Sequence, residues 1–266
     1  MTRLGQHFLA DANLLRKIVA ALDPQTGDAV VEIGPGTGNL TRILAPLVRN
    51  VVAIEKDRRL AAECGTRNAE CGIANVEIVV GDALRLDWHA LATTHHALRT
   101  PVKVIGNIPY SITSPLIEQA LTPPLPERVV FLVQREVADR IAAAPGSKRY
   151  GALSVGVQAV CGVEKLFTVK AGAFRPVPKV ESALVRLTPR AEPLIGPEET
   201  GAFRAFVAAC FSRRRKQLRN AVMAATGRPA GAVSALLEAL GLDSRARPET
   251  LPPETFARLL RASRQM

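Results

Sequence analysis

The sequence predicts an α/β domain with a mostly parallel sheet and an antiparallel edge, followed by a small all-α domain. Two observations support this fold class. Between residues 28 and 188, short runs rich in β-branched residues alternate with helix-length amphipathic stretches, which is typical of βαβ units. After Thr188 the strand pattern ends, and apolar residues recur at helical spacing. We therefore predict two domains, residues 1–188 and residues 189–266.

The first expected element is an amphipathic helix, with Asp11 or Asn13 as its N-cap and an end at Asp23 and Pro24. Apolar runs typical of parallel strands buried on both faces follow at 29–33, 51–55, 76–80, 102–105 and 128–134. The later runs 163–169 and 183–187 leave no room for a helix between them. They predict an antiparallel pair at the edge of the sheet.

The C-terminal region begins with a proline-rich linker at Pro189, Pro193 and Pro197. Apolar residues at helical spacing then predict helices at 203–211, at 233–240 and from residue 256 onward. Gly241 is a typical stop for the second of these helices.

Charge favours a polyanionic partner. The 266 residues carry a net charge of +11, and the sequence pI is about 10.2. Of the 35 Lys and Arg residues, 13 lie between residues 189 and 266 beside only 7 acidic residues, so the last third is the more basic. This distribution favours nucleic acid over a membrane as the partner.

No apolar run is long enough to span a bilayer, and the N-terminus lacks a signal-peptide pattern, so we expect a cytoplasmic protein. The cysteines Cys64, Cys71, Cys161 and Cys210 form no CxxC pair, and the histidines add no metal-ligand spacing. We expect buried, reduced thiols and no metal site.

A glycine-rich loop follows the first strand. Gly34, Gly36 and Gly38 remove side chains where the backbone must turn and approach a ligand. A dinucleotide fingerprint would place glycine at position 39, where this chain has Asn39. Glu32, just before the loop, would repel a pyrophosphate but suits a cationic ligand.

Carboxylates also follow the next two strands. Glu55 ends the second strand, 21 residues after Gly34, and Asp82 with Ala83 follows the third. Ligands of open α/β sheets bind at this carboxyl edge, where an acidic residue meets ribose hydroxyls. The combination resembles the S-adenosylmethionine site of Rossmann-like class I methyltransferases. That resemblance assigns the ribose to Glu55, the adenine amino group to Asp82, and the methionine portion to Gly34.

The fourth strand ends in Asn107-Ile108-Pro109-Tyr110. An amide oxygen and a turn carbonyl can accept both hydrogens of an exocyclic amine, and Tyr110 can stack on its base. Attack on a methyl group then needs geometry more than a strong base. The Asn-x-Pro-Tyr pattern resembles that of enzymes that methylate adenine N6, cytosine N4 or glutamine. A nucleotide target must leave its stack to reach such a site.

Further motifs resemble the ribosomal RNA adenine dimethylase family, and its small-subunit members most closely. They are 5–9 (GQHFL), 107–110 (NIPY), 148–151 (KRYG), 174–182 (FRPVPKVES) and 211–220 (FSRRRKQLRN). The resemblance implies dimethylation of N6 of two adjacent adenosines in a hairpin near the 3′ end of 16S rRNA. The implied cofactor is S-adenosylmethionine. The implied partner is 16S rRNA in an immature small ribosomal subunit, with the enzyme acting as a monomer.

The resemblance also implies roles for individual residues. His7 and Leu9 close over the cofactor, and His7 is not a catalytic base. Phe174 is a second stacking face for the flipped adenine, with a core phenylalanine as the alternative. A basic helix is expected to meet RNA phosphates through Arg213, Arg214, Arg215, Lys216 and Arg219, with a solvated charged helix as the alternative.

Three other functions remain open. The large-subunit rRNA adenine methylases of macrolide resistance share the glycine loop and Asn-x-Pro-Tyr. A binding protein descended from the family could act as a ribosome-assembly factor or a mitochondrial-type transcription factor. A nicotinamide dehydrogenase is disfavoured by Asn39.

Overall fold

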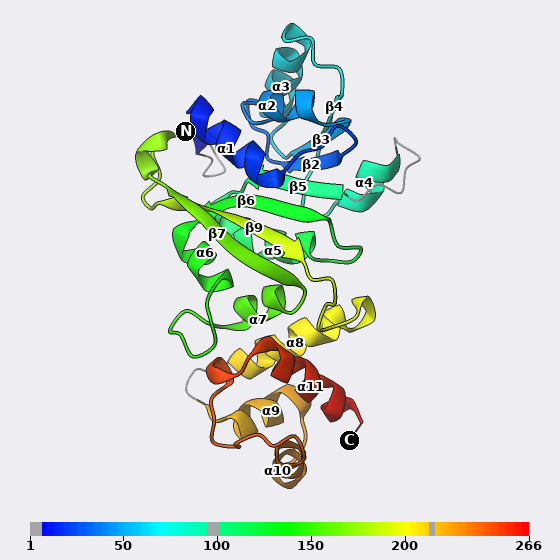
Figure 1. Cartoon of the computed structure of the whole chain (residues 1–266), viewed down its shortest axis with the longest axis vertical. Helices are drawn as coiled ribbons and strands as arrows, with labels where there is room; N and C mark the ends of the chain where they lie inside the picture. The colour runs from blue at the N-terminus through cyan, green and yellow to red at the C-terminus, as the bar shows by residue number, and fades with distance from the viewer. Residues whose placement is uncertain (1–6, 95–101, 213–215, 266) are drawn as a thin grey trace. The chain divides into compact units, whose positions relative to one another are not determined.

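The structure is a computed structural model that describes residues 7–94, 102–212 and 216–265. Its centre is a seven-stranded sheet in the order β4-β3-β2-β5-β6-β9-β7 (Figure 1). The strands are β2 (Ala29–Ile33), β3 (Asn50–Glu55), β4 (Val76–Val80), β5 (Val102–Asn107), β6 (Arg128–Gln134), β7 (Cys161–Val169) and β9 (Ser182–Pro189). Strands β2 to β6 pair in parallel, and β9 is antiparallel to β6. The predicted mostly parallel sheet with an antiparallel edge is confirmed.

Helix α1 (Ala12–Leu22) precedes the sheet and packs on β5, β6 and β9. Asp11 is its N-cap, because the Asp11 carboxylate accepts hydrogen bonds from the backbone N–H groups of Asn13 and Leu14 at 2.8 and 3.1 Å. The helix ends at Asp23, whose φ of 54° is left-handed. The other helices up to residue 160 are α2 (Thr41–Leu44), α3 (Arg58–Glu70), α4 (Trp88–Thr94), α5 (Thr113–Ala120), α6 (Arg135–Ile141) and α7 (Ala152–Gln158).

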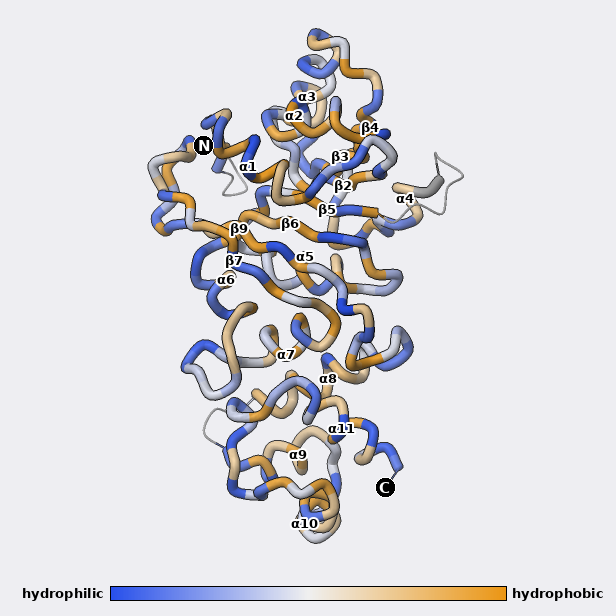
Figure 2. The backbone as a smooth tube through the Cα atoms, viewed as in Figure 1, coloured by the Kyte–Doolittle hydropathy of each residue, from blue (hydrophilic) through white to orange (hydrophobic). Residues whose placement is uncertain are grey.

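The core on one face of the sheet lies beneath α1. Leu15, Ile18 and Leu22 of this helix belong to the same buried cluster as Ile105 and Val130 of the sheet. Strand β6 is hydrophobic along most of its length (Figure 2), as expected for a strand covered on both faces. This burial holds the carboxyl ends of the strands in a fixed arrangement.

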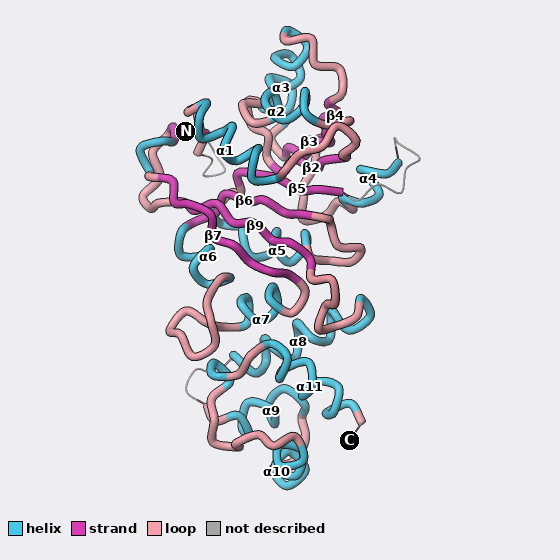
Figure 3. The backbone as a smooth tube through the Cα atoms, viewed as in Figure 1, coloured by secondary structure: helices cyan, strands magenta, loops and turns pink. Residues whose placement is uncertain are grey.

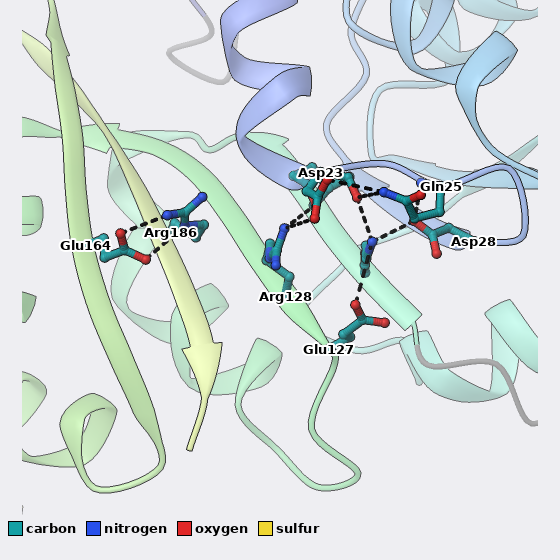
Figure 4. A network of polar contacts seen from close by, with 9 residues as sticks. Asp23, Gln25, Asp28, Glu127, Arg128, Glu164 and Arg186 are labelled. Atoms are coloured by element: carbon teal, nitrogen blue, oxygen red, sulfur yellow. Dashed lines mark hydrogen bonds and ion pairs between the residues drawn. The ribbon is translucent and has the colours of Figure 1, made fainter. Parts of the chain in front are cut away.

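An ion-pair network lies at the amino-terminal ends of β5 and β6 (Figure 4). Lys103 is 1% exposed, and its Nζ lies 2.7 Å from an Asp28 carboxylate oxygen and donates to the Asp23 carbonyl at 2.8 Å. Arg128 pairs with the Asp23 carboxylate at 3.0 Å. A buried ammonium group needs such partners, so the network fixes the edge of the sheet opposite the predicted site.

A second, two-stranded sheet was not predicted. Strand β1 (Phe8–Leu9) pairs antiparallel with β8 (Phe174–Arg175), which brings Leu9 opposite Phe174. Each strand has only two residues, too few to show alternation in the sequence. The pairing joins the N-terminal segment to the segment before Pro176 and Pro178.

Residues 190–265 contain only helices and loops where the structure describes them (Figure 3). The helices are α8 (Thr200–Phe211), α9 (Leu218–Thr226), α10 (Ala230–Ala239) and α11 (Pro253–Arg264). Helix α9 is not predicted as a separate helix by the apolar spacing. It ends at Gly227, whose φ is 70°. Lys216 precedes α9 and is not helical, so the basic run does not form one continuous helix.

The chain divides into two compact units. One ends at Ala138 and resumes over Glu164–Pro189; the other comprises Asp139–Val163 and the chain from Arg190 onward. The segment 139–163 thus groups with the C-terminal helices, whereas the predicted boundary lies at 188 and 189. Hydrogen bonds from Tyr150 Oη to the Leu251 carbonyl and from Gly146 N to the Glu249 carbonyl hold this segment within the second unit.

Two further sequence expectations concern membrane helices and thiols. No helix among the described residues is long and apolar enough to cross a membrane. Cys64, Cys161 and Cys210 are buried as expected, but Cys71 is exposed. Its position just past the end of α3 explains the exposure, because the apolar face of that helix ends before it.

Candidate functional site

The glycine loop after β2 requires all three of its glycines. Gly34, Gly36 and Gly38 have φ values of 69°, 58° and 79°, which L side chains rarely adopt. A Cβ on Gly36 would lie 2.7 Å from Phe8 Cε1, and one on Gly38 would lie 2.9 Å from Cys64 Sγ. Gly34 therefore faces the Asn107 carbonyl at the end of β5, Gly36 faces Phe8, and Gly38 permits close packing on Cys64 of α3.

Glu55 is tied to this loop. Its Oε2 accepts a hydrogen bond from Gly36 N at 3.1 Å, and its Oε1 accepts one from Asp57 N at 2.9 Å. Burial of the carboxyl, which is 2% exposed, raises its pKa. The carboxylate at the end of β3 thus fixes the glycine loop and has lone pairs left for a hydroxyl donor.

Glu32 lies beneath the same loop. It is 1% exposed, and burial raises its pKa to about 7, with a smaller contribution from the charge of Glu55. Its Oε2 has no hydrogen-bond partner among the residues that the structure describes, and Glu32 lines a small cavity with Gly34 and Asn107. A buried carboxylate oxygen without a partner is costly, so a cationic or N–H group in this cavity would be stabilised.

Asp82 lies at the same edge, after β4. Its Oδ2 is 2.8 Å from Lys56 Nζ, and its Oδ1 accepts from Leu84 N at 3.1 Å. The hydrogen bond from Lys56 lowers the pKa of Asp82, which keeps the carboxyl ionised. Ala83 is buried, and its carbonyl accepts a hydrogen bond from Trp88 Nε1 at 2.7 Å.

Asn107 is the last residue of β5. Its Nδ2 donates a hydrogen bond to the His7 backbone carbonyl at 2.8 Å. This bond identifies the nitrogen end of the amide, because a carbonyl can only accept. Oδ1 forms no hydrogen bond with any described residue, so it is available to an N–H donor.

His7 and Tyr110 flank this amide. His7 Nδ1 donates to the Pro176 carbonyl at 2.7 Å, and its ring lies 5.6 Å from the Tyr110 ring, centroid to centroid. Tyr110 Oη shares a hydrogen bond with Ser182 Oγ at 2.7 Å, and burial raises its pKa. The Pro109 carbonyl accepts from Thr113 Oγ1 at 3.2 Å, which braces the turn. One small cavity is lined by Gly34, Gly36, Asn107, Pro109 and Tyr110 together with His7, Phe8 and Ile108.

Other predicted residues are not at this cavity. Phe174 is fully buried within the hydrophobic core, so the structure favours the alternative of a core phenylalanine over a stacking face. Its pairing with Leu9 in the two-stranded sheet accounts for the burial. Lys216 is exposed and Arg219 is half-buried in the C-terminal unit. Arg213, Arg214 and Arg215 lie outside the described residues.

Phe8, Asn39 and Arg42 support the site but were not predicted. Asn39 Nδ2 donates to the Leu9 carbonyl at 3.1 Å, and its Oδ1 accepts from Arg42 Nη2 at 2.8 Å. Arg42 Nη1 also donates to the Thr37 carbonyl at 2.9 Å. Asn39, which disfavours a dinucleotide site, therefore links the buried Leu9 through Arg42 to the glycine loop. Only the departure from glycine at position 39 marked it in the sequence.

The cavities at this site are smaller than those that usually hold a nucleoside-sized ligand. Phe8 lines the cavities on both sides of the glycine loop, and their volumes are only about 40 and 30 Å³. Pockets that bury small organic ligands usually measure about 300–1,000 Å³. Among the described residues, no group of three or more His, Cys, Asp or Glu side chains is placed to hold a metal ion.

The parallel sheet, the glycine loop and the Asn-x-Pro-Tyr turn together define a class I methyltransferase. Residues 1–263 match the family described as Ribosomal RNA adenine dimethylase. The chain belongs to this family.

Comparison with individual proteins agrees with this assignment. The chain is 44% identical to the Ribosomal RNA small subunit methyltransferase A of Nitrosococcus oceani over 260 residues, which cover 97% of this chain and 94% of that protein. The crystal structure of a dimethyladenosine transferase from Plasmodium falciparum superposes with a TM-score of 0.82 at 30% identity, covering 95% of this chain and 96% of that one. The 23S rRNA methyltransferase ErmE gives a TM-score of 0.72 at 29% identity, covering 97% of this chain and all of that one.

Proposed function

We propose that this protein uses S-adenosylmethionine to dimethylate N6 of two adjacent adenosines in a hairpin near the 3′ end of 16S rRNA. The substrate is the rRNA within an immature small ribosomal subunit. We further expect the protein to act as a monomer in the cytoplasm. The relatives named as small-subunit methyltransferases support the choice of 16S over large-subunit rRNA. The observation that carries the chemistry is the Asn107 amide, whose nitrogen is bound to His7 and whose oxygen is available.

The residues present fit S-adenosylmethionine. The unpaired Oε2 of Glu32 and the cradle at Gly34 and Gly36 suit a cationic methionine portion, because carboxylates stabilise positive charge and the glycines permit close approach. Glu55 and Asp82 offer acceptors for the ribose hydroxyls and the adenine amino group. When bound, the cofactor supplies an electrophilic methyl group on a sulfonium.

The target adenine would donate an N6 hydrogen to Asn107 Oδ1. This hydrogen bond favours a pyramidal nitrogen whose lone pair is available for attack. Tyr110 supplies an aromatic face for the flipped base, and its bond to Ser182 limits movement of the ring. The cavity therefore performs positioning and charge stabilisation rather than strong base catalysis.

The RNA is held partly by the basic C-terminal unit. Lys216 and Arg219 lie at the beginning of α9, beside the arginines at positions 213–215 in the sequence. We assign these cations to the RNA backbone, since phosphate contacts fix register without reading the bases.

The decisive experiment uses purified protein, S-adenosylmethionine with a labelled methyl group, and small subunits from cells that lack this methylation. Mass spectrometry should find N6,N6-dimethyladenosine at two neighbouring positions of 16S rRNA. Methylation confined to large-subunit rRNA would overturn the proposal in favour of the resistance-methylase alternative. Subunit binding without methylation would support an assembly-factor role.

A further inference from the structure

A groove on the C-terminal unit shares no lining residue with the catalytic cavity. It is formed between the end of α8 and α9 and has a volume of about 420 Å³. That volume falls in the range of about 300–1,000 Å³ typical of pockets for small organic groups. Buried Cys210 and half-buried Met223 contribute to its apolar lining. The exposed polar residues described in its lining are Ser212, Lys216, Asn220 and Arg228.

The charge of the groove has one sign. Among the described residues that line it, Lys216 and Arg228 are cationic and none is acidic. Neither cation forms an ion pair with another described residue. Arg149 and Arg261 of the same unit are instead paired with the carboxylates of Asp139 and Glu199. The groove therefore retains two positive charges that an anionic partner can neutralise.

The two cations are separated by helix α9. Lys216 precedes this helix and Arg228 follows Gly227, its C-cap. The nine residues of α9 span about 13 Å, at about 1.5 Å each, so the charges lie near opposite ends of the groove. This distance exceeds that between adjacent phosphates of one strand, so it suits phosphates on either side of a short unpaired segment, with an apolar group between them, rather than a single small anion.

The lining between the cations suits a nucleobase. Met223 offers a thioether, which makes favourable contacts with aromatic rings. Asn220 offers an amide, a group that can donate to and accept from the edge of a base. RNA recognition commonly uses such unstacked bases in loops and bulges.

We propose that this groove binds one unpaired nucleotide of the ribosomal RNA, separate from the adenosine being methylated. The base lies on the apolar lining beside Met223, and phosphates further along the strand on either side of this nucleotide lie at Lys216 and Arg228. This inference rests on the proposed function because RNA is the proposed substrate. It adds a second RNA contact, which positions the substrate and takes no part in the chemistry.

The first test removes one phosphate contact. The probe is a fluorescently labelled single-stranded 12-nucleotide RNA, titrated with the full chain at several salt concentrations. Arg228→Gln should weaken binding about 3- to 10-fold and reduce the slope of log K against log salt by about 0.7. Arg59→Gln on α3, which also removes one exposed positive charge, should change neither value. Equal effects of the two variants would overturn the proposal, because net charge alone would explain them.

The second test asks whether a base enters the groove. Ala224 is exposed and lines it, so Ala224→Leu should fill the groove without disturbing the fold, which a thermal melt checks. The wild type should prefer the 12-mer RNA to an abasic ribose-phosphate chain of the same length. Ala224→Leu should lose that preference and keep the salt slope. A retained preference would overturn nucleotide insertion, even if Arg228→Gln weakens binding.

Methylation separates this inference from the proposed function. With small subunits as substrate, both groove variants should raise KM and leave kcat unchanged, because the groove is not part of the catalytic cavity. A lower kcat with an unchanged KM would overturn the positioning role. If the wild type binds RNA but does not methylate small subunits, the proposed reaction is wrong. The two RNA-binding tests then still show whether the groove binds a nucleotide.

Discussion

Asn107 and His7, which are 100 residues apart in the chain, are joined by a hydrogen bond of 2.8 Å from the Asn107 side-chain nitrogen to the His7 backbone carbonyl. The bond spans from the end of β5 to the residue before β1. It fixes which end of the amide is available, because the nitrogen is already used. The orientation of the proposed catalytic amide therefore depends on the N-terminal segment.

Asn107→Ala should nearly abolish methylation. The variant removes the acceptor for the adenine N6 hydrogen, and loss of one such electrostatic contact costs about 10²–10³ in kcat. Binding to small subunits should stay within about twofold, since the RNA contacts are elsewhere. The measurement is single-turnover methylation together with subunit binding by filtration. A lost subunit affinity with normal single-turnover rate would assign Asn107 to RNA binding instead.

His7→Ala should lower methylation more than His7→Asn does. The imidazole Nδ1 holds the Pro176 carbonyl at 2.7 Å, and alanine cannot make this bond. Asparagine can donate to the same carbonyl through its side-chain amide. Loss of one neutral hydrogen bond costs about 0.5–1.5 kcal/mol, so we expect His7→Ala to lower kcat about 10-fold. The kcat of His7→Asn should stay within about 3-fold of the wild-type value. Equal activities of the two variants would show that the bond to Pro176 has no positioning role.

Gly36→Ala should destabilise the protein more than Gly72→Ala does. Both glycines have positive φ, 58° and 67°, so each alanine carries a backbone cost of about 1–2 kcal/mol. The Gly36 Cβ would also meet Phe8 at 2.7 Å, whereas nothing lies within 4 Å of a Cβ on Gly72. Urea unfolding should give an additional loss for Gly36→Ala of about 1–3 kcal/mol. Adding Phe8→Leu to Gly36→Ala should recover part of the lost free energy of unfolding. No recovery would show that contact with the Phe8 ring does not cause the additional loss.

The sheet could be predicted closely from the sequence. The expected strands 29–33, 76–80 and 128–134 have the bounds that the structure gives to β2, β4 and β6. β2 and β6 are buried along most of their length and so appear as continuous apolar runs, which local composition reveals. The expected burial on both faces is wrong for β4, which is only partly buried because it lies at the edge of the sheet. The same apolar runs also locate the ends of the strands. Glu55 is the last residue of β3, and Asp82 follows β4 by two residues.

The contacts between distant segments could not be predicted. The Asn107 bond to His7, the link from Arg42 through Asn39 to Leu9, and the burial of Phe174 all depend on how the N-terminal segment folds back on the loop. Tertiary contacts of this kind leave no periodic signal, and two-residue strands are too short to produce one. Sequence patterns therefore placed the functional groups at one edge of the sheet without giving their hydrogen-bond partners.

One thiol should react much faster than the others. Cys71 is exposed, whereas Cys64, Cys161 and Cys210 are buried, and burial raises the pKa of Cys161 and Cys210 to about 12. Reactivity requires an accessible thiolate. Titration with a chromogenic disulfide at pH 8 should give one fast equivalent in the native protein and four in denaturant. Cys71→Ser should remove the fast equivalent; a fast phase that persists would place another cysteine at the surface.

The Glu199–Arg261 pair should make the C-terminal unit sensitive to acid. Glu199 accepts two hydrogen bonds from Arg261, at 2.9 and 2.7 Å, and one from Gly196 N at 2.9 Å. The bonds from Arg261 lower the pKa of Glu199 from 4.5 to about 2. Because the folded pKa lies below the unfolded one, the carboxylate stabilises the fold fully above pH 4.5 and progressively less as the pH falls toward 2.

Comparison of Glu199→Gln with the wild type tests this dependence. Near neutral pH, the variant should lose about 1–3 kcal/mol in the free energy of unfolding, as expected for charge-assisted hydrogen bonds. The difference from wild type should shrink between pH 4.5 and pH 2, because protonation removes the same charge from Glu199. Exposed Glu198 provides the matched control, and Glu198→Gln should stay within about 0.5 kcal/mol at every pH. A difference between Glu199→Gln and wild type that does not change with pH would show that the charge of Glu199 is not what stabilises the unit.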